Sequence, residues 1–203
     1  TTQLGVGFRS VTVRMRQALD LYANVRPAFT IPGVRALYDD LDLVILRENT
    51  EGMYSGIEHD VIPGEAAEAI RLITRKSSER IVRYAFEYAR KHGKKARGAG
   101  ENNTLALIGK SNVLTHMYKL WNRVFAEIGE SEFPDVKREY YHVDATCLYM
   151  VVSPEMFDVL VVENMFGDII TDLGAMIQGG LGVAAGGNIN PNGVSMFEPI
   201  GGT

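Results

Sequence analysis

Hydrophobic residues along this chain gather in short, unbroken runs that are separated by longer segments with helical spacing. Three runs are apolar almost throughout, which is typical of strands buried on both faces: residues 41–46, 104–108 and the stretch that begins at Phe157 and ends at Asn164. Val136 to His142 alternates as a strand with one covered face should. Residues 13–22, 65–92 and 111–128 show helical periodicity, with Gly93 and Gly129 suited to close the last two. This alternation predicts an α/β architecture.

Composition narrows the class of protein. With 203 residues, 46% of them hydrophobic and 23% charged, the chain is long enough to bury one substantial core or two small ones. A formal net charge of -4 argues against a nucleic-acid partner. No apolar run has membrane-spanning length, no leader opens the chain, and the single Cys147 fits a reducing compartment. We therefore expect no membrane partner and a cytoplasmic location, with the mitochondrial matrix open for a eukaryotic source.

Two aspartates follow the last buried strand. Gly167 is expected to turn the chain into a helix in which Asp168 and Asp172, four residues apart, share one face. Two carboxylates placed in this way repel each other unless a cation lies between them, and Mg²⁺ prefers such hard oxygen ligands. The alternative is a solvated acidic helix face.

Arginines supply the complementary charge. Arg47 closes the strand 41–46, at the carboxyl end where open α/β sheets place their ligands, and Arg16 and Arg26 lie upstream. A single arginine is usually a surface ion-pair partner. Three of them in one site would bind a small polyanion and fix its orientation.

A glycine-rich segment, GGLGVAAGGN at 179–188, does not predict a nucleotide site. Its spacing is not G-x-G-x-x-G, and it follows a helix where the dinucleotide fingerprint follows a strand. We interpret it as a helix exit and turn. The four histidines lack the spacing of a zinc site.

Several motifs in this order resemble one known family. FRSVTVRMRQALDLYANVRP, RENTEGMYSGIEH, GKSNVL, HVDA, NMFGDIITDLGA and SMFEP are similar to segments of the isocitrate and isopropylmalate dehydrogenases, which are decarboxylating β-hydroxyacid dehydrogenases. The resemblance runs over essentially the whole chain. It implies that family's α/β fold, with residues 23–178 as the small substrate, metal and dimerisation domain and a clasp-like segment at about 55–82. Residues 1–22 and 179–203 would belong to the large cofactor domain.

The resemblance also implies a role for each candidate residue. Asp144, Asp168 and Asp172 match the family's ligands for Mg²⁺ or Mn²⁺, and Tyr54 and Lys110 match residues that move protons in catalysis. Lys110 and Asp144 would complete the site of a neighbouring subunit, so we expect a homodimer or higher oligomer. Alternatively, Tyr54 is an interface aromatic and Lys110 a surface lysine. Substrate-binding positions are Ser10, Thr12, Arg16, Arg26 and Arg47, and cofactor positions are Thr2, Glu198 and Gly202.

The implied reaction is metal-dependent oxidative decarboxylation of a 2-hydroxy-3-carboxy acid by a nicotinamide cofactor. Ser10 and Thr12 favour isocitrate, because a hydroxyl buried against an isopropyl group would lack a partner at a cost of about 1 to 3 kcal/mol. The later motifs are as similar to isopropylmalate enzymes, so 3-isopropylmalate is the alternative, with homoisocitrate or a tartrate-like acid behind it. The first half most resembles NAD-linked members, with NADP not excluded. A non-catalytic regulatory subunit is a further alternative.

Two departures from the family pattern stand out. Family members begin with a strand and a motif of the GDGIGPE type and continue past an EP-HGSAP loop, so this chain is expected to lack both terminal segments. In FEPIGGT, Gly201 stands where the family has a histidine that stacks on adenine, which puts adenine binding by this loop in doubt.

Overall fold

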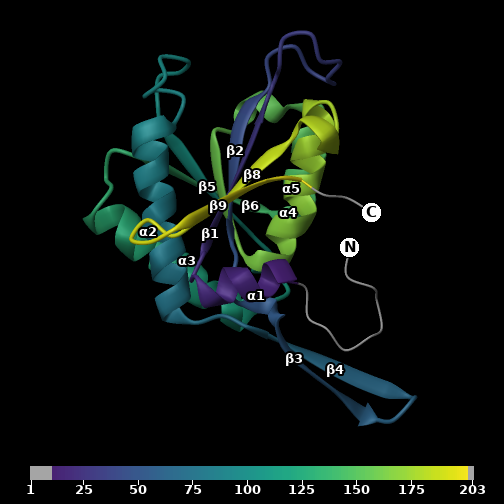
Figure 1. The fold of residues 1–203 in the computed structure, drawn as a ribbon. Coiled ribbons are helices and arrows are strands. Elements are labelled where there is room, and N and C mark those ends of the chain that lie inside the picture. Colours follow the sequence, from purple (N-terminus) through teal and green to yellow (C-terminus); the bar gives the residue numbers. More distant parts are fainter. Residues whose placement is uncertain (1–10, 201–203) are drawn as a thin grey trace.

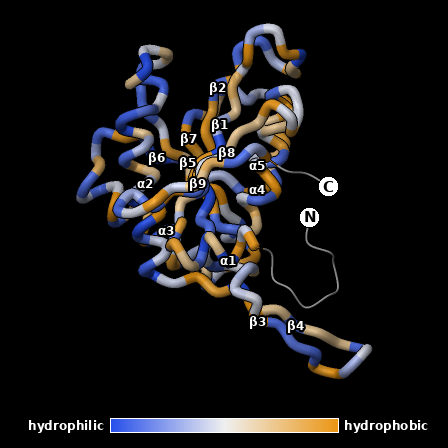
Figure 2. Tube along the Cα trace, in the orientation of Figure 1, coloured by the Kyte–Doolittle hydropathy of each residue, from blue (hydrophilic) through white to orange (hydrophobic). Residues whose placement is uncertain are grey.

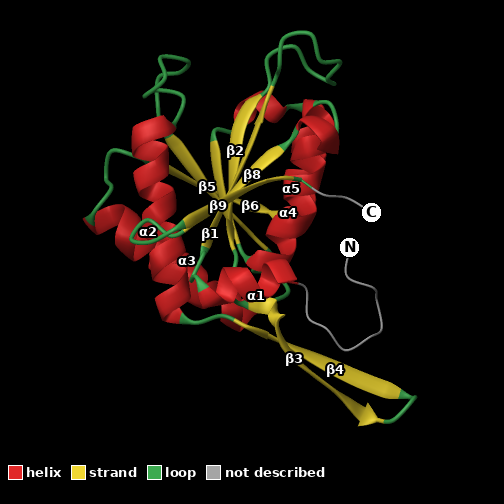
Figure 3. Cartoon of the chain, in the orientation of Figure 1, coloured by secondary structure: helices red, strands yellow, loops and turns green. Residues whose placement is uncertain are grey.

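A mixed seven-stranded sheet forms the centre of the molecule, and a two-stranded ribbon projects from it (Figures 1 and 3). The structure, a computed structural model, describes residues 11–200. Helices lie on both faces of the sheet, as the α/β prediction requires. The elements, in chain order, are α1 (Val11–Ala18), β1 (Ala23–Phe29), β2 (Asp42–Glu48), β3 (Gly52–Ile62), β4 (Ala66–Leu72), α2 (Arg75–His92), β5 (Thr104–Gly109), α3 (Thr115–Ser131), β6 (Lys137–His142), α4 (Val143–Val152), η1 (Pro154–Met156), β7 (Val159–Val162), α5 (Asn164–Gln178), η2 (Leu181–Val183), β8 (Ala185–Ile189) and β9 (Ser195–Pro199).

The strand order is β6-β5-β7-β2-β1-β8-β9. The first four of these strands are mutually parallel, whereas β1 is antiparallel to β2 and β8, and β8 is antiparallel to β9. The carboxyl ends of β6, β5, β7 and β2 therefore meet at one edge of the sheet. The β3–β4 ribbon and α1 lie on this side of the molecule (Figure 1).

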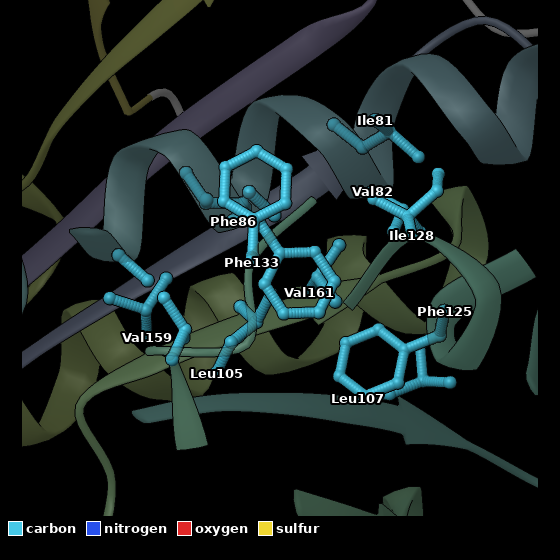
Figure 4. Packing of buried hydrophobic residues seen from close by; sticks show 14 of the residues in the cluster. Ile81, Val82, Phe86, Leu105, Leu107, Phe125, Ile128, Phe133, Val159 and Val161 are labelled. Atoms are coloured by element: carbon cyan, nitrogen blue, oxygen red, sulfur yellow. The ribbon is translucent and has the colours of Figure 1, made fainter. Parts of the chain in front are cut away.

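Each face of the sheet carries its own hydrophobic core. On one face, α2 and α3 pack against alternate strand residues, among them Leu105, Leu107, Val159 and Val161 (Figure 4). The intervening residues of the same strands, such as Ile108, face α4 and α5 on the other side. The strands are accordingly apolar through the middle of the fold (Figure 2). Burying one Leu or Val side chain stabilises the folded state by about 1.5 to 3 kcal/mol. The two hydrophobic layers therefore fix the strands, and with them the sheet edge at which the strands end.

The helix expected over residues 65–92 is wrong in its first third. Residues Ala66–Leu72 form β4, which pairs with β3 in an antiparallel ribbon, and α2 begins only at Arg75. The side chain of Thr74 accepts a hydrogen bond from the amide of Ser77 and caps the helix there. Gly64, at a φ of 76°, makes the ribbon turn.

Other element boundaries also differ from the sequence expectation. The first helix ends at Ala18, and α3 starts at Thr115 and runs past Gly129 to Ser131. The glycine-rich segment leaves α5 at Gly179 as expected, but its second half is a strand, β8. Strands β1 and β9 were not anticipated.

The sheet is continuous across the expected domain boundary near residue 178. Strand β8 pairs with β1 and β9 pairs with β8, so residues 185–199 extend the sheet that the rest of the chain builds. The division into a small and a large domain stays a prediction. Among residues 11–200, no helix has the length and apolar character needed to cross a membrane.

Candidate active site

Arg47 is a buried cation at the carboxyl end of β2. Its side chain is only 2% exposed. Its Nε and Nη2 atoms both donate to the side-chain oxygen of Asn164, at 3.0 and 2.7 Å, and its Nη1 atom donates to Asp168. Asn164 and Asp168 are one turn apart on α5, so this helix holds the guanidinium from two sides.

The start of α5 differs from the sequence expectation. Gly167 does not turn the chain, because the helix begins at Asn164, with the buried carboxylate of Glu163 accepting from the amides of Met165 and Phe166. Gly167 instead makes room: a Cβ atom there would lie 2.5 Å from Cγ of Arg47. The glycine thus lets the helix approach the arginine side chain.

Tyr54 joins the same cluster from β3. Its hydroxyl donates to Oδ2 of Asp168 at 2.5 Å, and its ring centroid lies 5.3 Å from the guanidinium carbon of Arg47. Burial raises the pKa of Tyr54 above its usual 10, and the hydrogen bond to Asp168 raises that pKa further. The phenol is therefore a proton donor, not a phenolate, at neutral pH.

Asp172 follows one turn after Asp168. Burial raises the pKa of Asp172, and the negative charge of Asp168 raises it further, partly offset by Arg26 and Arg47. Two repelling carboxylates of this kind suit a divalent cation that takes oxygen ligands. Within residues 11–200, however, no three acidic, histidine or cysteine side chains come together as a metal site, so one chain supplies this pair alone.

Arg16 and Arg26 lie beside this cluster. Nη2 of Arg16 pairs with Glu198 at 3.3 Å, and Nε of Arg26 donates to Asn24 at 2.9 Å. Burial lowers the pKa of both arginines, and the nearby charge of Arg47 lowers it further. Nε of Arg16 and Nη1 of Arg26 are buried and have no hydrogen-bond partner among the described residues. Three neighbouring cations, two of them with unpartnered donors, could bind a polyanion.

A chain of buried amides connects Arg16 with Arg26, through Glu198, and it was not predicted from the sequence. The side-chain oxygen of Asn188 accepts from Asn24 and Asn49, both at 2.9 Å, and its nitrogen donates to Glu198 at 2.9 Å. Glu198 and Arg26 are thereby linked through Asn188 and Asn24. The sequence offers only three separate asparagines, which carry no site information by themselves.

Lys110 and Asp144 form a separate pair. Lys110 Nζ lies 2.6 Å from Asp144 Oδ1, and this contact lowers the pKa of Asp144. Lys110 follows β5 and Asp144 opens α4 directly after β6, at the same sheet edge as Arg47. Strand β6 is three positions from β2, roughly 14 Å at about 4.8 Å per strand. The two halves of the expected site therefore lie apart along this edge.

Four candidates remain. Thr12 lies in the first turn of α1 and is partly buried. Thr2, Ser10 and Gly202 lie outside the described residues, as does Gly201.

Comparison with known proteins identifies a family. A family model described as isocitrate/isopropylmalate dehydrogenase matches residues 2–203. The chain is 41% identical to the mitochondrial isocitrate dehydrogenase (NAD) catalytic subunit 6 of Arabidopsis thaliana and 41% identical to the chloroplastic 3-isopropylmalate dehydrogenase of Solanum tuberosum. Both alignments cover 100% of this chain, with 51% and 54% of the respective relatives.

Solved structures agree. The crystal structure of isocitrate dehydrogenase from Methylococcus capsulatus superposes with a TM-score of 0.89 at 47% sequence identity. The match covers 100% of this chain and 57% of that one. The chain thus spans about half the length of the curated relatives described above.

Proposed function

Because the chain belongs to the isocitrate/isopropylmalate dehydrogenase family, we propose that the full-length protein oxidises and decarboxylates a 2-hydroxy-3-carboxy acid, with isocitrate as substrate, NAD as cofactor and Mg²⁺ or Mn²⁺ as metal. The observation that carries the proposal is the convergence of Arg16, Arg26 and Arg47 beside Asp168 and Asp172. In this arrangement a polyanion-binding surface adjoins a metal-binding pair.

The arginines would bind the substrate carboxylates and fix their orientation. Arg26 and Arg16 each keep a buried, unpartnered nitrogen, and an uncompensated buried donor costs about 1 to 3 kcal/mol. A carboxylate supplies acceptors for these donors. Because a guanidinium is not deprotonated in proteins, both side chains stay charged.

Asp168 and Asp172 would hold the metal, and Asp144 of the partner subunit would complete its ligands. When bound, such a cation acts as a Lewis acid on substrate oxygens and stabilises the charge that develops on decarboxylation. Without a cation, burial and the charge of Asp168 disfavour the ionised form of Asp172. A cation bound by both carboxylates would favour that ionised form.

Tyr54 and Lys110 would move the protons. The raised pKa of Tyr54 keeps its hydroxyl protonated, as a donor to the carbon that loses CO₂ must be. Lys110 would assist deprotonation of the substrate hydroxyl in the neighbouring subunit's site. The separation of Lys110 and Asp144 from Arg47 along the sheet edge supports sites shared within a homodimer or higher oligomer.

Isocitrate is favoured over 3-isopropylmalate by Ser10 and Thr12, whose hydroxyls would otherwise face an isopropyl group. NAD is favoured by the name of the Arabidopsis relative, an NAD isocitrate dehydrogenase. The relatives are about equally similar in both subfamilies, so 3-isopropylmalate is the second candidate.

One assay tests the proposal. Full-length protein with Mg²⁺ and NAD is given isocitrate or 3-isopropylmalate, and formation of the reduced cofactor is followed by absorbance. We expect Mg²⁺-dependent turnover that is faster with isocitrate. Faster turnover of 3-isopropylmalate would reassign the substrate. An absence of reduced cofactor with either acid, and with NADP in place of NAD, would contradict the proposed activity and favour the regulatory-subunit alternative.

A further inference from the structure

We infer that Asn164 is a positioning residue that fixes the Arg47 guanidinium and the turn before Tyr54 in one relative orientation. The inference rests on the proposed function, because it assigns Asn164 a part in seating the substrate. Asn164 is the first residue of α5 and is almost fully buried. Asn164 contacts both Arg47 and the turn before Tyr54, but the sequence did not mark it as a candidate residue.

The side chain of Asn164 uses both of its functional groups. Its oxygen accepts from Nε and Nη2 of Arg47, and its nitrogen donates to the backbone carbonyl of Glu51 at 2.8 Å. Glu51 is three residues before Tyr54. A single amide therefore connects the arginine of β2 with the turn that leads into β3.

That turn is held closely against Asn164. Gly52 has a φ of 81°, and a Cβ atom there would lie 3.2 Å from Cβ of Asn164. On its other side, the buried carboxylate of Glu48 accepts from the backbone amides of Thr50 and Glu51. The turn is therefore held by Glu48 on one side and by Asn164 on the other. Without the Asn164 contact, the bonds to Glu48 would remain, and only the part of the turn near Arg47 would be free to move.

The contacts of Arg47 determine which donors remain for a substrate. A guanidinium has five N–H groups. Asn164 occupies the one on Nε and one on Nη2, and Asp168 occupies one on Nη1. Neither of the two remaining N–H groups, one on each terminal nitrogen, has a carboxylate or amide acceptor among residues 11–200, and a substrate carboxylate could accept from them.

The neutral amide is well suited to this task. A carboxylate at position 164 could also hold Nε and Nη2, but it would add a second negative charge beside Arg47, which already contacts Asp168. It would also place an oxygen against the carbonyl of Glu51. Asn164 orients the guanidinium without reducing the positive charge that attracts the substrate.

The test uses full-length protein carrying Asn164→Ala or the nearly isosteric Asn164→Asp. Asn103→Ala is the matched control, because Asn103 is also a buried asparagine whose oxygen accepts from the amide of Ala96 and whose nitrogen donates to the carbonyl of Arg90. We expect both Asn164 variants to lower kcat/KM for isocitrate at least about tenfold, mainly through KM, and Asn103→Ala to leave the kinetic constants within about twofold. In an Arg47→Ala background, Asn164→Ala should cost less than about threefold, since its main partner is gone.

Two results would overturn the inference. One is kinetic constants for the Asn164 variants within twofold of the wild type; if Asn164→Ala fails to fold, Asn164→Asp carries this comparison. The other is a crystal structure of either variant in which the Arg47 guanidinium keeps its wild-type orientation. The structural result is independent of activity, so wild-type protein that turns over neither acid would contradict the proposed function, whereas an unmoved Arg47 would contradict the positioning role.

Discussion

Gly167 of α5 and Arg47 of β2 pack so closely that a single added carbon atom would collide with the arginine side chain. A Cβ atom at Gly167 would lie 2.5 Å from Cγ, 2.8 Å from Cβ and 3.0 Å from Cδ of Arg47. The stem of the arginine is thus confined by the helix backbone, while its guanidinium is held by Asn164 and Asp168. Substrate affinity should therefore depend on a residue that has no side chain.

Gly167→Ala tests this dependence. Alanine is favoured over glycine in a helix by about 0.5 to 1 kcal/mol, but overpacking of this kind costs about 1 to 3 kcal/mol, so we expect a small net loss of stability. Displacement of Arg47 should raise KM at least about tenfold. Gly174→Ala on the same helix is the control, because its Cβ would meet only side-chain methyl groups: the terminal methyl of Ile45 at 3.1 Å, and those of Ala28 and Met150 at 3.6 Å. Equal kinetic constants for the two variants would contradict the packing argument.

Tyr54→Phe isolates the proton-donating hydroxyl. The variant keeps the aromatic ring beside Arg47 but loses the hydrogen bond to Asp168. We expect kcat to fall by about 10²- to 10⁴-fold, the usual range for a general acid, with a much smaller change in KM. Steady-state kinetics measures the split. A KM effect with unchanged kcat would instead assign Tyr54 to binding.

A mixing experiment tests whether sites are shared between subunits. Lys110→Ala and Arg47→Ala remove residues from the two separate groups at the sheet edge. If each site takes Lys110 from one subunit and Arg47 from the other, a mixed dimer contains one site with both residues intact. Co-refolded variants should then recover part of the wild-type activity, up to about half per mixed dimer. Mixed dimers that form, shown by mass, but stay inactive would contradict the shared geometry.

Asp158 should make the folded protein less stable as pH rises. Burial raises the pKa of this carboxyl above its ordinary 3.8, despite hydrogen bonds from the amides of Lys94 and Thr104. Between the ordinary and the raised pKa the folded state binds more protons than the unfolded state, so this contribution is present below pH 3.8 and is lost as pH increases through the raised value. Urea unfolding measures the free energy of unfolding of the wild type and of Asp158→Asn. As pH rises from 3.8 through the raised pKa, the wild type should lose stability relative to Asp158→Asn.

Asp135 provides the control of opposite sign. Its exposed carboxyl is paired with Arg90, which lowers its pKa. Its contribution is present above pH 3.8 and is lost as pH falls through the lowered value. As pH rises, the free energy of unfolding of the wild type should therefore increase relative to that of Asp135→Asn. Slopes of the same sign for the two variants would contradict the assignment of burial as the cause at Asp158.

Two of the residues proposed from sequence lie near the carboxyl ends of buried parallel strands. Arg47 directly follows the apolar run 41–46, and Asp168 lies on the helix that follows β7, so an α/β pattern is expected to bring both to one edge of the sheet. Asn164 was not a candidate, because an uncharged asparagine at the end of an apolar run has no feature that marks it as a partner of Arg47, 117 positions earlier in the sequence. The pairing of Asn24 with Asn188 spans 164 residues and requires the sheet order.

The strands that sequence did not predict lack a clear apolar strand pattern. In β4 almost every side chain is exposed, so no alternation marks it as a strand, and its alanine-rich sequence favours a helix. Strand β1 contains Arg26 and Pro27, which interrupt its apolar run, and Pro27 lies beyond the part of β1 that pairs with β8. Both segments form strands by pairing with strands that the sequence places elsewhere: β1 with β2 and β8, and β4 with β3.

We propose that acidic side chains of two subunits bind one divalent cation beside a cluster of arginines. A crystal structure of the full-length protein with Mg²⁺ and isocitrate tests it most directly. We expect one Mg²⁺ ion held by Asp168 and Asp172 and by Asp144 of the partner subunit, at about 2.0 to 2.1 Å for direct carboxylate ligands, with the substrate carboxylates on Arg16, Arg26 and Arg47. Carboxylates that share no ion, or a substrate bound away from these three arginines, would contradict a metal site shared between subunits.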